Sequence, residues 1–214
     1  NIWTEIDADH PDEARILSNT LDLNPDIAGP HATVGVAHAV NVSYREVVRV
    51  GCRFMFPAIQ KGENLRIELV DMDGLTENKI WVSFTNTATE IHTLAAPDVT
   101  NIFLPQPGIS YNVEVELSPG MQIGDYVHLY FWNAGPKPAQ PLQMVLQATA
   151  VDVLPDSGAD GFTVNQIRFI AGAPVKIDDV SVQDLPEWQA ATDYRLGDPS
   201  FVDFFYRINS PVVG

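Results

Sequence analysis

The chain has 214 residues, of which 28 are acidic and 12 are basic, so its formal net charge is −16 at pH 7. Nucleic acid is bound through positive surfaces, and this charge therefore excludes it as an expected partner. No apolar run reaches the length of a membrane-spanning helix, so no membrane insertion is expected. The single cysteine, Cys52, lies in an apolar run, which predicts a buried thiol.

Strand signals dominate the sequence. Only residues 10–15 suggest a short helix, with a proline in its first turn. Most of the 16 prolines and 14 glycines fall between apolar runs, where turns require them. Many short strands without a βαβ rhythm predict an all-β fold, a two-sheet antiparallel β-sandwich. The strands are expected over 32–44, 46–56, 63–71, 78–86, 88–95, 100–104, 110–118, 125–133, 142–150, 161–170 and 174–184.

Three predicted strands between residues 63 and 95 carry polar or ring-bearing side chains on the face opposite their apolar positions. Strand alternation puts Arg66 and Glu68 on that face of the first strand and Trp81 on that face of the second. His92 lies in the third strand. We predict that these four side chains bind a ligand.

The strand over 110–118 shows the clearest alternation, with Glu114 and Glu116 on one face. Two carboxylates could serve a glycoside hydrolase if they flanked a cleft. The E-x-D-x-x-E pattern of laminarinase-like enzymes is absent, so solvated acids on an outer face are the favoured interpretation.

A row of rings follows in the strand over 125–133. Tyr126, His128, Tyr130 and Trp132 alternate with apolar residues and therefore share one face. Each ring carries a hydrogen-bonding group, which suits a sugar with apolar C–H faces and a polar rim. Burial of both faces of this strand is the alternative interpretation. The row is predicted to bind a ligand together with the four side chains of the earlier strands.

The tail over 186–214 differs from the rest of the chain because it is rich in aromatic residues and follows the last clear strand. We divide the chain into a sandwich domain over 1–185 and a C-terminal arm over 186–214. The arm is expected to pack either on the sandwich or on another subunit, which would make the protein a homo-oligomer.

From residue 46 to residue 184 the order of elements resembles the concanavalin-like, laminin-G-type jelly roll and the related carbohydrate-binding modules. The most telling feature is the closing strand over 175–182, whose Ile-Asp-Asp-Val-Ser-Val run is common in such modules. The resemblance implies a jelly-roll β-sandwich and a secreted protein that binds a glycan or polysaccharide. The start of the chain at Asn1, without methionine, fits a processed or trimmed secreted protein, and an arbitrary boundary within a longer chain would look the same.

The same resemblance implies a structural calcium ion near an acid of the closing strand. Asp178 and Asp179 are the matching positions, and alternation places them on opposite faces, so one of them is the expected ligand. Asp71 and Asp73 form a rival site beside a glycine turn, for which a plain surface turn is the favoured interpretation.

A second resemblance is to alginate lyases of the jelly-roll type, which carry three motif strands in a fixed order. The matching segments here start at Arg66, end at His92 and start at Tyr130. The segments depart from the family at Val70, Glu90 and Trp132, and Glu90 would repel a uronate. The resemblance implies a lyase centre of Arg66, His92 and Tyr130 as a weaker alternative.

We therefore predict non-catalytic, lectin-like glycan binding at an extracellular surface, and leave open whether the protein is an enzyme. The main alternative is a structural subunit of a virion, filament or surface layer. That alternative is supported by the aromatic tail, the acidity and an opening over 3–6 that resembles some phage and appendage surface proteins.

Overall fold

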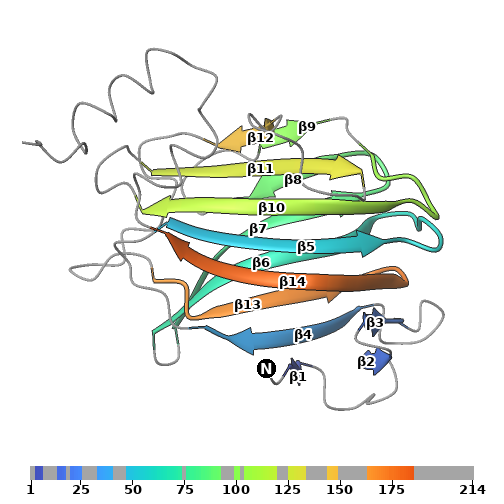
Figure 1. Ribbon diagram of the computed structural model, residues 1–214, viewed down its shortest axis with the longest axis horizontal. Coiled ribbons are helices and arrows are strands. Elements are labelled where there is room, and N and C mark those ends of the chain that lie inside the picture. Colours follow the sequence, from blue (N-terminus) through green and yellow to red (C-terminus); the bar gives the residue numbers. More distant parts are fainter. Residues whose placement is uncertain are drawn as a thin grey trace, which may run out of the picture.

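The computed structural model describes residues 3–6, 14–17, 20–25, 33–40, 47–73, 76–92, 99–101, 104–119, 125–133, 144–148 and 163–185. Within these residues the regular elements are strands, and all recorded pairings are antiparallel (Figure 1). The strands are β1 (Thr4–Glu5), β2 (Ala14–Leu17), β3 (Thr20–Leu23), β4 (Val34–Ala39), β5 (Val47–Met55), β6 (Glu63–Asp73), β7 (Thr76–Thr85), β8 (Thr89–His92), β9 (Val99–Asn101), β10 (Ser110–Pro119), β11 (Asp125–Asn133), β12 (Met144–Ala148), β13 (Gln166–Ala171) and β14 (Val175–Leu185).

The strands form two seven-stranded sheets that face one another. The first, here called sheet A, has the order β1-β4-β13-β6-β7-β8-β9. The second, sheet B, has the order β12-β11-β10-β5-β14-β3-β2 and lies in front of sheet A in Figure 1. The mixing of distant strands within each sheet confirms the predicted jelly-roll β-sandwich.

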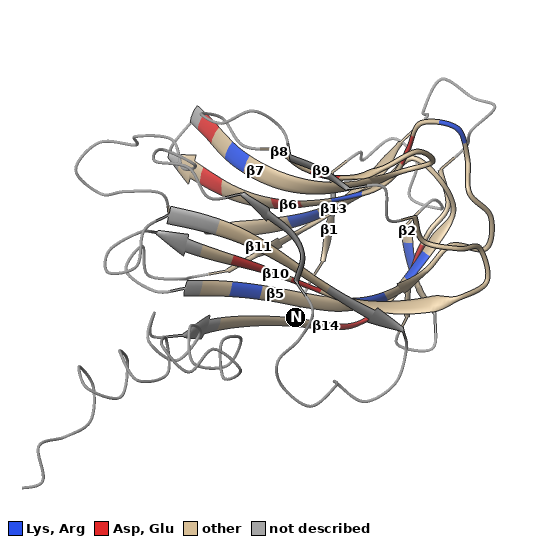
Figure 2. Cartoon of the chain, turned by 90° about the horizontal axis from the view of Figure 1, so that it is seen from above, with Lys and Arg blue, Asp and Glu red and all other residues tan. Residues whose placement is uncertain are grey.

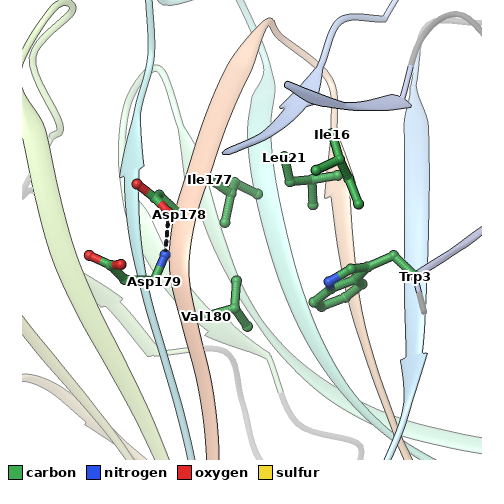
Figure 3. A pocket seen from close by; sticks show the side chains of 7 residues that line it. All are labelled: Trp3, Ile16, Leu21, Ile177, Asp178, Asp179 and Val180. Carbon is green, nitrogen blue, oxygen red and sulfur yellow. Dashed lines mark hydrogen bonds between the residues drawn. The ribbon is translucent and has the colours of Figure 1, made fainter. Parts of the chain in front are cut away.

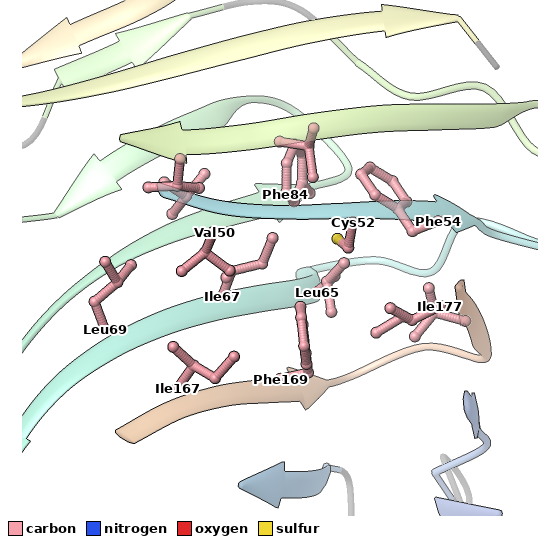
Figure 4. Packing of buried hydrophobic residues seen from close by; sticks show 14 of the residues in the cluster. Val50, Cys52, Phe54, Leu65, Ile67, Leu69, Phe84, Ile167, Phe169 and Ile177 are labelled. Carbon is pink, nitrogen blue, oxygen red and sulfur yellow. The ribbon is translucent and has the colours of Figure 1, made fainter. Parts of the chain in front are cut away.

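The core lies between the sheets and is built by strand alternation. In β13, for example, Ile167, Phe169 and Ala171 are fully buried and the intervening residues are half-buried. Phe169 of sheet A and Phe54 of sheet B belong to one continuous apolar cluster (Figure 4). The inward faces of both sheets build the core, so the polar side chains that could contact a ligand lie on the outward faces.

Cys52 is part of this core, as predicted, and is 4% exposed. Burial raises the pKa of its thiol, because the thiolate would lose its hydration inside the apolar cluster. The residue is therefore an unreactive core side chain.

The sandwich closes along one edge, where β12 of sheet B lies beside β9 and β8 of sheet A (Figure 1). At the opposite edge the last strands are β1 and β2, which are only two and four residues long. Short edge strands present few unpaired backbone groups.

A tight corner joins β13 to β14. Gly172 and Ala173 donate backbone hydrogen bonds to the carbonyl of Asn64, at 3.1 and 3.3 Å. A Cβ atom added to Gly172 would collide with the backbone carbonyl of Glu63. Glycine is needed here because the two backbones approach too closely for any side chain.

Each strand predicted between residues 32 and 184 overlaps an observed strand, and the described ends agree within about five residues; β13, for example, begins at Gln166 instead of 161. The helix predicted over 10–15 is wrong where the structure describes it, because Ala14 and Arg15 begin β2. The sequence analysis also missed β1 and β3, which are too short to show a period. The predicted arm over 186–214 lies outside the described residues, so its packing and the oligomeric state stay predictions.

Candidate functional site

Sheet A carries a cross-strand row of polar and aromatic side chains on its outward face. Arg168 of β13 pairs with Glu68 of β6, Glu68 pairs with Trp81 of β7, and Trp81 pairs with His92 of β8. The neighbouring row places Arg66 opposite Ser83 and Ser83 opposite Glu90. We call this surface the Trp81 patch, which consists of Arg66, Glu68, Lys79, Trp81, Ser83, Glu90, His92 and Arg168.

The centre of the patch is a stack of two rings. The indole of Trp81 and the imidazole of His92 lie 4.8 Å apart between centroids and 12° from parallel. Nε2 of His92 lies 3.0 Å from the hydroxyl of Ser83 and 3.2 Å from a carboxylate oxygen of Glu90. The stack is thus fixed by polar neighbours as well as by ring contact.

Two cations lie against the same indole. The guanidinium of Arg66 and the ammonium of Lys79 lie 5.8 and 5.9 Å from the Trp81 ring centroid. Both distances are within the range of cation–π attraction. Both side chains remain partly exposed, at 26% and 31%, so their polar ends can contact a ligand at the edge of the stack.

The cations are held by a buried carboxylate beneath them. Glu68 is 1% exposed and has Arg66 at 3.2 Å, Lys79 at 3.4 Å and Arg168 at 3.6 Å. A buried carboxylate is stable only when it is paired, so Glu68 ties the three cations to one point. Charged residues recur along β6, β7 and β13 in Figure 2.

Two further acids, Glu77 and Glu63, lie against the cations of the patch. Glu77 accepts a hydrogen bond from Arg168, which together with a smaller contribution from Lys79 lowers the pKa of the Glu77 carboxyl. Glu63 lies 3.5 Å from Arg66. Burial raises the pKa of Glu63, and the charge of Arg66 opposes that shift.

The patch therefore offers half-buried rings surrounded by fixed donors and acceptors. Such a surface can lie against the apolar face of a small ring while it hydrogen-bonds the hydroxyl groups at the ring's edge. Arg66, Glu68, Trp81 and His92 were predicted to share a face, and the structure brings these four together.

The ring-bearing strand β11 belongs to sheet B, and this corrects the prediction of one continuous ligand face. Val127 and Leu129 are in the core, so His128 and Tyr130 point to the outward face of sheet B, away from sheet A. Two groups on the outward faces of opposite sheets cannot line the same site. The predicted eight-residue face is therefore divided between two surfaces.

His128 and Tyr130 are also not exposed. They are 3% and 2% exposed, and Nδ1 of His128 lies 3.1 Å from the Tyr130 hydroxyl. For these two residues the alternative interpretation, burial on both faces of the strand, is the one that the structure favours. Tyr126 and Trp132 pair with Ser118 and Asn112 through their backbones, and their side chains lie outside the described set.

The same division separates the three residues of the weaker lyase alternative. Arg66 and His92 lie on sheet A, whereas Tyr130 is buried on sheet B. A lyase needs its neutralising group, base and acid around one sugar ring. The structure does not assemble that centre.

Glu116 also differs from its predicted solvated state. It is 1% exposed and accepts hydrogen bonds from Arg49, whose Nη2 lies 2.8 Å away. Glu114 is 15% exposed and lies 3.9 Å from Arg49. Glu116 thus forms a structural ion pair with Arg49 of the adjacent strand, and Glu114 lies next to this pair.

Asp178 and Asp179 lie at a bulge in β14, where the pairing with β5 shifts between Asp178 and Ser181. Asp179 has a positive φ of 51°. This left-handed residue breaks the alternation, so the two carboxylates reach the same partner, with Arg53 Nη2 2.6 Å from Asp178 and 3.0 Å from Asp179. The prediction of opposite faces is wrong, since a bulge adds an extra residue to one strand.

This arrangement does not fit the predicted calcium site. A calcium ion requires six to eight oxygen ligands, whereas Arg53 already supplies the positive charge between the two carboxylates. Its hydrogen bond, followed by one from the backbone N–H of Asp179, lowers the pKa of Asp178. In the described ranges, no group of three or more His, Cys, Asp or Glu side chains could hold a metal ion.

A hollow of ≈ 170 Å³ lies beside the bulge (Figure 3). In Figure 3, Trp3 lies on the far side of this hollow from Asp178 and Asp179, with Ile177 and Val180 between them. Trp3 also packs on Phe169, at 5.4 Å between ring centroids. The indole therefore covers the core at the edge of the sandwich.

Asp71, from the rival calcium site, connects β6 to the segment that precedes β13. Asp71 is 6% exposed and accepts hydrogen bonds from the backbone N–H of Thr163 and the amide of Asn165, at 3.1 and 3.5 Å. Both carboxylate oxygens are used to hold the segment that precedes β13. The expectation of a plain surface turn is corrected for Asp71, which is buried.

Sequence analysis missed Lys79 and Arg168, which are essential to the patch. Alternation could have placed Lys79 on the face of Trp81, because the two residues are two positions apart in one strand. Arg168 could not be found this way. Its contact with Glu68 depends on the pairing of β13 with β6, which brings together two residues that are 100 positions apart in the sequence.

No family model and no curated protein matches this sequence. Solved structures do match its fold. The Emp46p carbohydrate recognition domain in its metal-free form has a TM-score of 0.58 at 10% identity, with 86% of this chain and 88% of that chain covered. The exoplasmic/lumenal domain of VIP36, in a Ca²⁺/Man3GlcNAc-bound form, has a TM-score of 0.55 at 10% identity, with 86% of each chain covered.

The sialidase of Trypanosoma rangeli is also similar, with a TM-score of 0.53 at 13% identity over 81% of this chain. This chain spans only 26% of that sialidase. At such identities the likeness establishes the fold alone. The protein has the predicted fold, a two-sheet antiparallel jelly-roll β-sandwich. No helix among the described residues is long and apolar enough to cross a membrane.

Proposed function

We propose that this protein binds carbohydrate without catalysis, through the Trp81 patch on the outward face of sheet A. The observation that carries the proposal is the stack of Trp81 on His92, whose ring centroids lie 4.8 Å apart. Paired charged side chains surround this stack. A sugar ring has apolar C–H faces and a hydroxyl rim, and the stack supplies ring edges next to fixed donors and acceptors.

The charges of the patch favour a ligand without a strong charge of its own. Arg66, Lys79 and Arg168 already pair with Glu63, Glu68 and Glu77, and Glu90 lies against His92. A charged ligand would have to displace one of these partners. Hydroxyl groups can instead share the donors and acceptors that remain at the rim.

The fold supports this proposal. Two of the proteins with the same fold are described as a carbohydrate recognition domain and as a domain bound to Man3GlcNAc. We further propose that binding takes place at an extracellular surface. Calcium through Asp178 and Asp179 is not part of the proposal, because Arg53 occupies the position between them.

A glycan array probed with the purified protein tests the proposal, followed by titration of the best neutral oligosaccharide. Trp81→Ala should weaken binding at least tenfold and leave the fold intact, since the indole lies outside the core. Leu104→Ala is the matched control, because Leu104 is 41% exposed and lies outside the patch. A parent protein that binds no glycan, or a Trp81→Ala variant that binds as tightly as the parent, would contradict the proposal.

A further inference from the structure

A second polar surface lies on the outward face of sheet B, at one end of the sandwich. It is a pocket of ≈ 280 Å³ that crosses the four neighbouring strands β3, β14, β5 and β10. The polar and flexible side chains that line it are Thr20, Arg53, Met55, Ser110, Lys176 and Asp178. The Trp81 patch is on the other sheet, so the two surfaces share no residue.

Register fixes the layout of this pocket. Met55 of β5 pairs with Ser110 on one side and with Lys176 on the other, which puts these three residues in one row. In the next row, Arg53 pairs with Asp178. Hydroxyl, thioether, ammonium, guanidinium and carboxylate groups are thereby gathered at one place by strands far apart in the sequence.

The ion pair of Arg53 and Asp178 is held by a hydrogen bond and is partly exposed to solvent. Its Nη2–Oδ2 distance is 2.6 Å, and the two side chains are 37% and 32% exposed. The remaining N–H groups of the guanidinium and the remaining lone pairs of the carboxylate form adjacent donors and acceptors. Two neighbouring hydroxyl groups of a sugar match such an arrangement, because each hydroxyl both donates and accepts.

The bulge beside the pocket is a second observation that points to a site. Asp179 adopts a left-handed backbone, which is uncommon for a residue other than glycine, although aspartate tolerates it better than most. Bulges of this kind re-aim side chains and are frequent next to binding sites. Here the bulge brings a second carboxylate to Arg53 and fixes the direction of the guanidinium.

The charge balance identifies the ligand class. Arg53 and Lys176 are positive, and Asp178 and Asp179, which both pair with Arg53, are negative. These four charges cancel, and Asp22 and Arg15, which continue the row of Lys176 across β3 and β2, add one charge of each sign. Neither an anionic nor a cationic ligand is therefore favoured. We propose that this pocket is a second carbohydrate site, which takes one residue of a neutral saccharide through Arg53, Asp178, Ser110 and Lys176.

This proposal is tested with neutral oligosaccharides, namely manno-, gluco- and galacto-tetrasaccharides, and with an acidic oligogalacturonate for comparison. Isothermal titration of the parent should show two sites for one of the neutral probes, and Trp81→Ala should show one. Adding Arg53→Lys to Trp81→Ala should weaken the remaining site at least tenfold. Lysine keeps the charge but loses the planar fork that can hold two hydroxyl groups.

Changes in amide chemical shifts, measured by NMR, show where the saccharide binds, whatever its affinity. In the Trp81→Ala protein, the neutral probe should shift the amides of Ser110, Lys176 and Met55, and the added Arg53→Lys substitution should remove those shifts. Lys61→Ala, on an exposed turn, is the control that should change nothing. Melting temperatures of all variants should be within a few degrees of the parent, which separates lost binding from lost folding.

The outcomes distinguish this proposal from the proposed function. If Trp81→Ala abolishes all binding and no shifts appear near Lys176, the second site is wrong and the Trp81 patch stands. If Trp81→Ala binds like the parent and Arg53→Lys removes binding, the pocket on sheet B stands and the Trp81 patch is wrong. Tighter binding of oligogalacturonate than of every neutral probe would overturn the proposed ligand class.

Discussion

The guanidinium of Arg49 and the carboxylate of Glu116 form a buried ion pair on the outward face of sheet B, with 2.8 Å between Nη2 and Oε2. Their side chains are 6% and 1% exposed. Removing one member of such a pair leaves the other charge buried without compensation. We therefore expect Glu116→Ala to lower the free energy of unfolding by about 3–5 kcal/mol, measured by urea denaturation.

Glu114→Ala is the matched control for this experiment, because Glu114 lies two residues away on the same face but farther from Arg49. Glu114→Ala should lower the free energy of unfolding by about 1 kcal/mol or less. Replacing both Arg49 and Glu116 by apolar residues of similar volume should recover most of the lost stability. Equal losses from Glu116→Ala and Glu114→Ala would show that the pair does not carry the stability of this face.

The two faces of β7 should respond differently to truncation. Phe84 is fully buried and packs against Phe54, at 4.9 Å between ring centroids, so Phe84→Ala should cost about 3–5 kcal/mol through the cavity it leaves. Trp81→Ala removes a larger ring from the outward face of the same strand. Thermal and urea unfolding should show a clearly smaller loss for Trp81→Ala; a loss as large as that of Phe84→Ala would place Trp81 in a core.

Acid should weaken the contacts of Asp178 and Glu77. Both carboxyls have pKa values lowered by hydrogen bonds from arginines, Asp178 from Arg53 and Glu77 from Arg168. A group whose pKa is lower in the folded state stabilises the fold above its unfolded pKa of about 4. That contribution is lost as the pH falls through the folded value.

Urea unfolding of Asp178→Asn and Glu77→Gln at pH 7 and near pH 2 tests this dependence. At pH 7 each variant should be less stable than the parent by up to about 1 kcal/mol, as is typical of partly exposed pairs. The difference should shrink towards zero near pH 2. A difference that is constant over this range would mean that the lost stability is not electrostatic.

Gly172→Ala should destabilise the corner between β13 and β14, because its Cβ would collide with the backbone carbonyl of Glu63. Backbone cannot move aside cheaply, so a loss of about 1–3 kcal/mol is expected. Gly51→Ala is the comparison, since its nearest obstacle is the hydroxyl of Ser181 at 2.8 Å, the end of a side chain that can rotate. Differential scanning calorimetry should rank Gly172→Ala as the more damaging substitution.

Much of the fold could be predicted because alternation is a local property. The run from Tyr111 to Leu117 shows which side chains of β10 are buried without any knowledge of its partners. The sequence-adjacent strands β6, β7 and β8 form successive antiparallel pairs, so Arg66, Trp81 and His92 were correctly placed on one face. These predictions needed only the period of a strand and the preference of successive strands to pair.

The errors of prediction arose where the pairing of strands far apart in the sequence decides the position of a residue. Alternation groups His128 with Tyr130, but it does not reveal which sheet their strand joins. The chain crosses from sheet A to sheet B between β9 and β10, and this crossing moved the rings of β11 away from Trp81. The N-terminal strands were missed for a related reason, since two to four residues acquire their strand geometry from their neighbours.

The left-handed backbone of Asp179 restricts which amino acids this position can hold. Glycine adopts that conformation at no cost, and asparagine and aspartate tolerate it better than other residues. Any sequence variant of this protein that keeps the bulge should therefore carry Gly, Asn or Asp at position 179. The second aspartate of the Ile-Asp-Asp-Val-Ser-Val run is thus a marker of backbone shape. Its recurrence in another chain would indicate a bulged closing strand, independently of any metal ion.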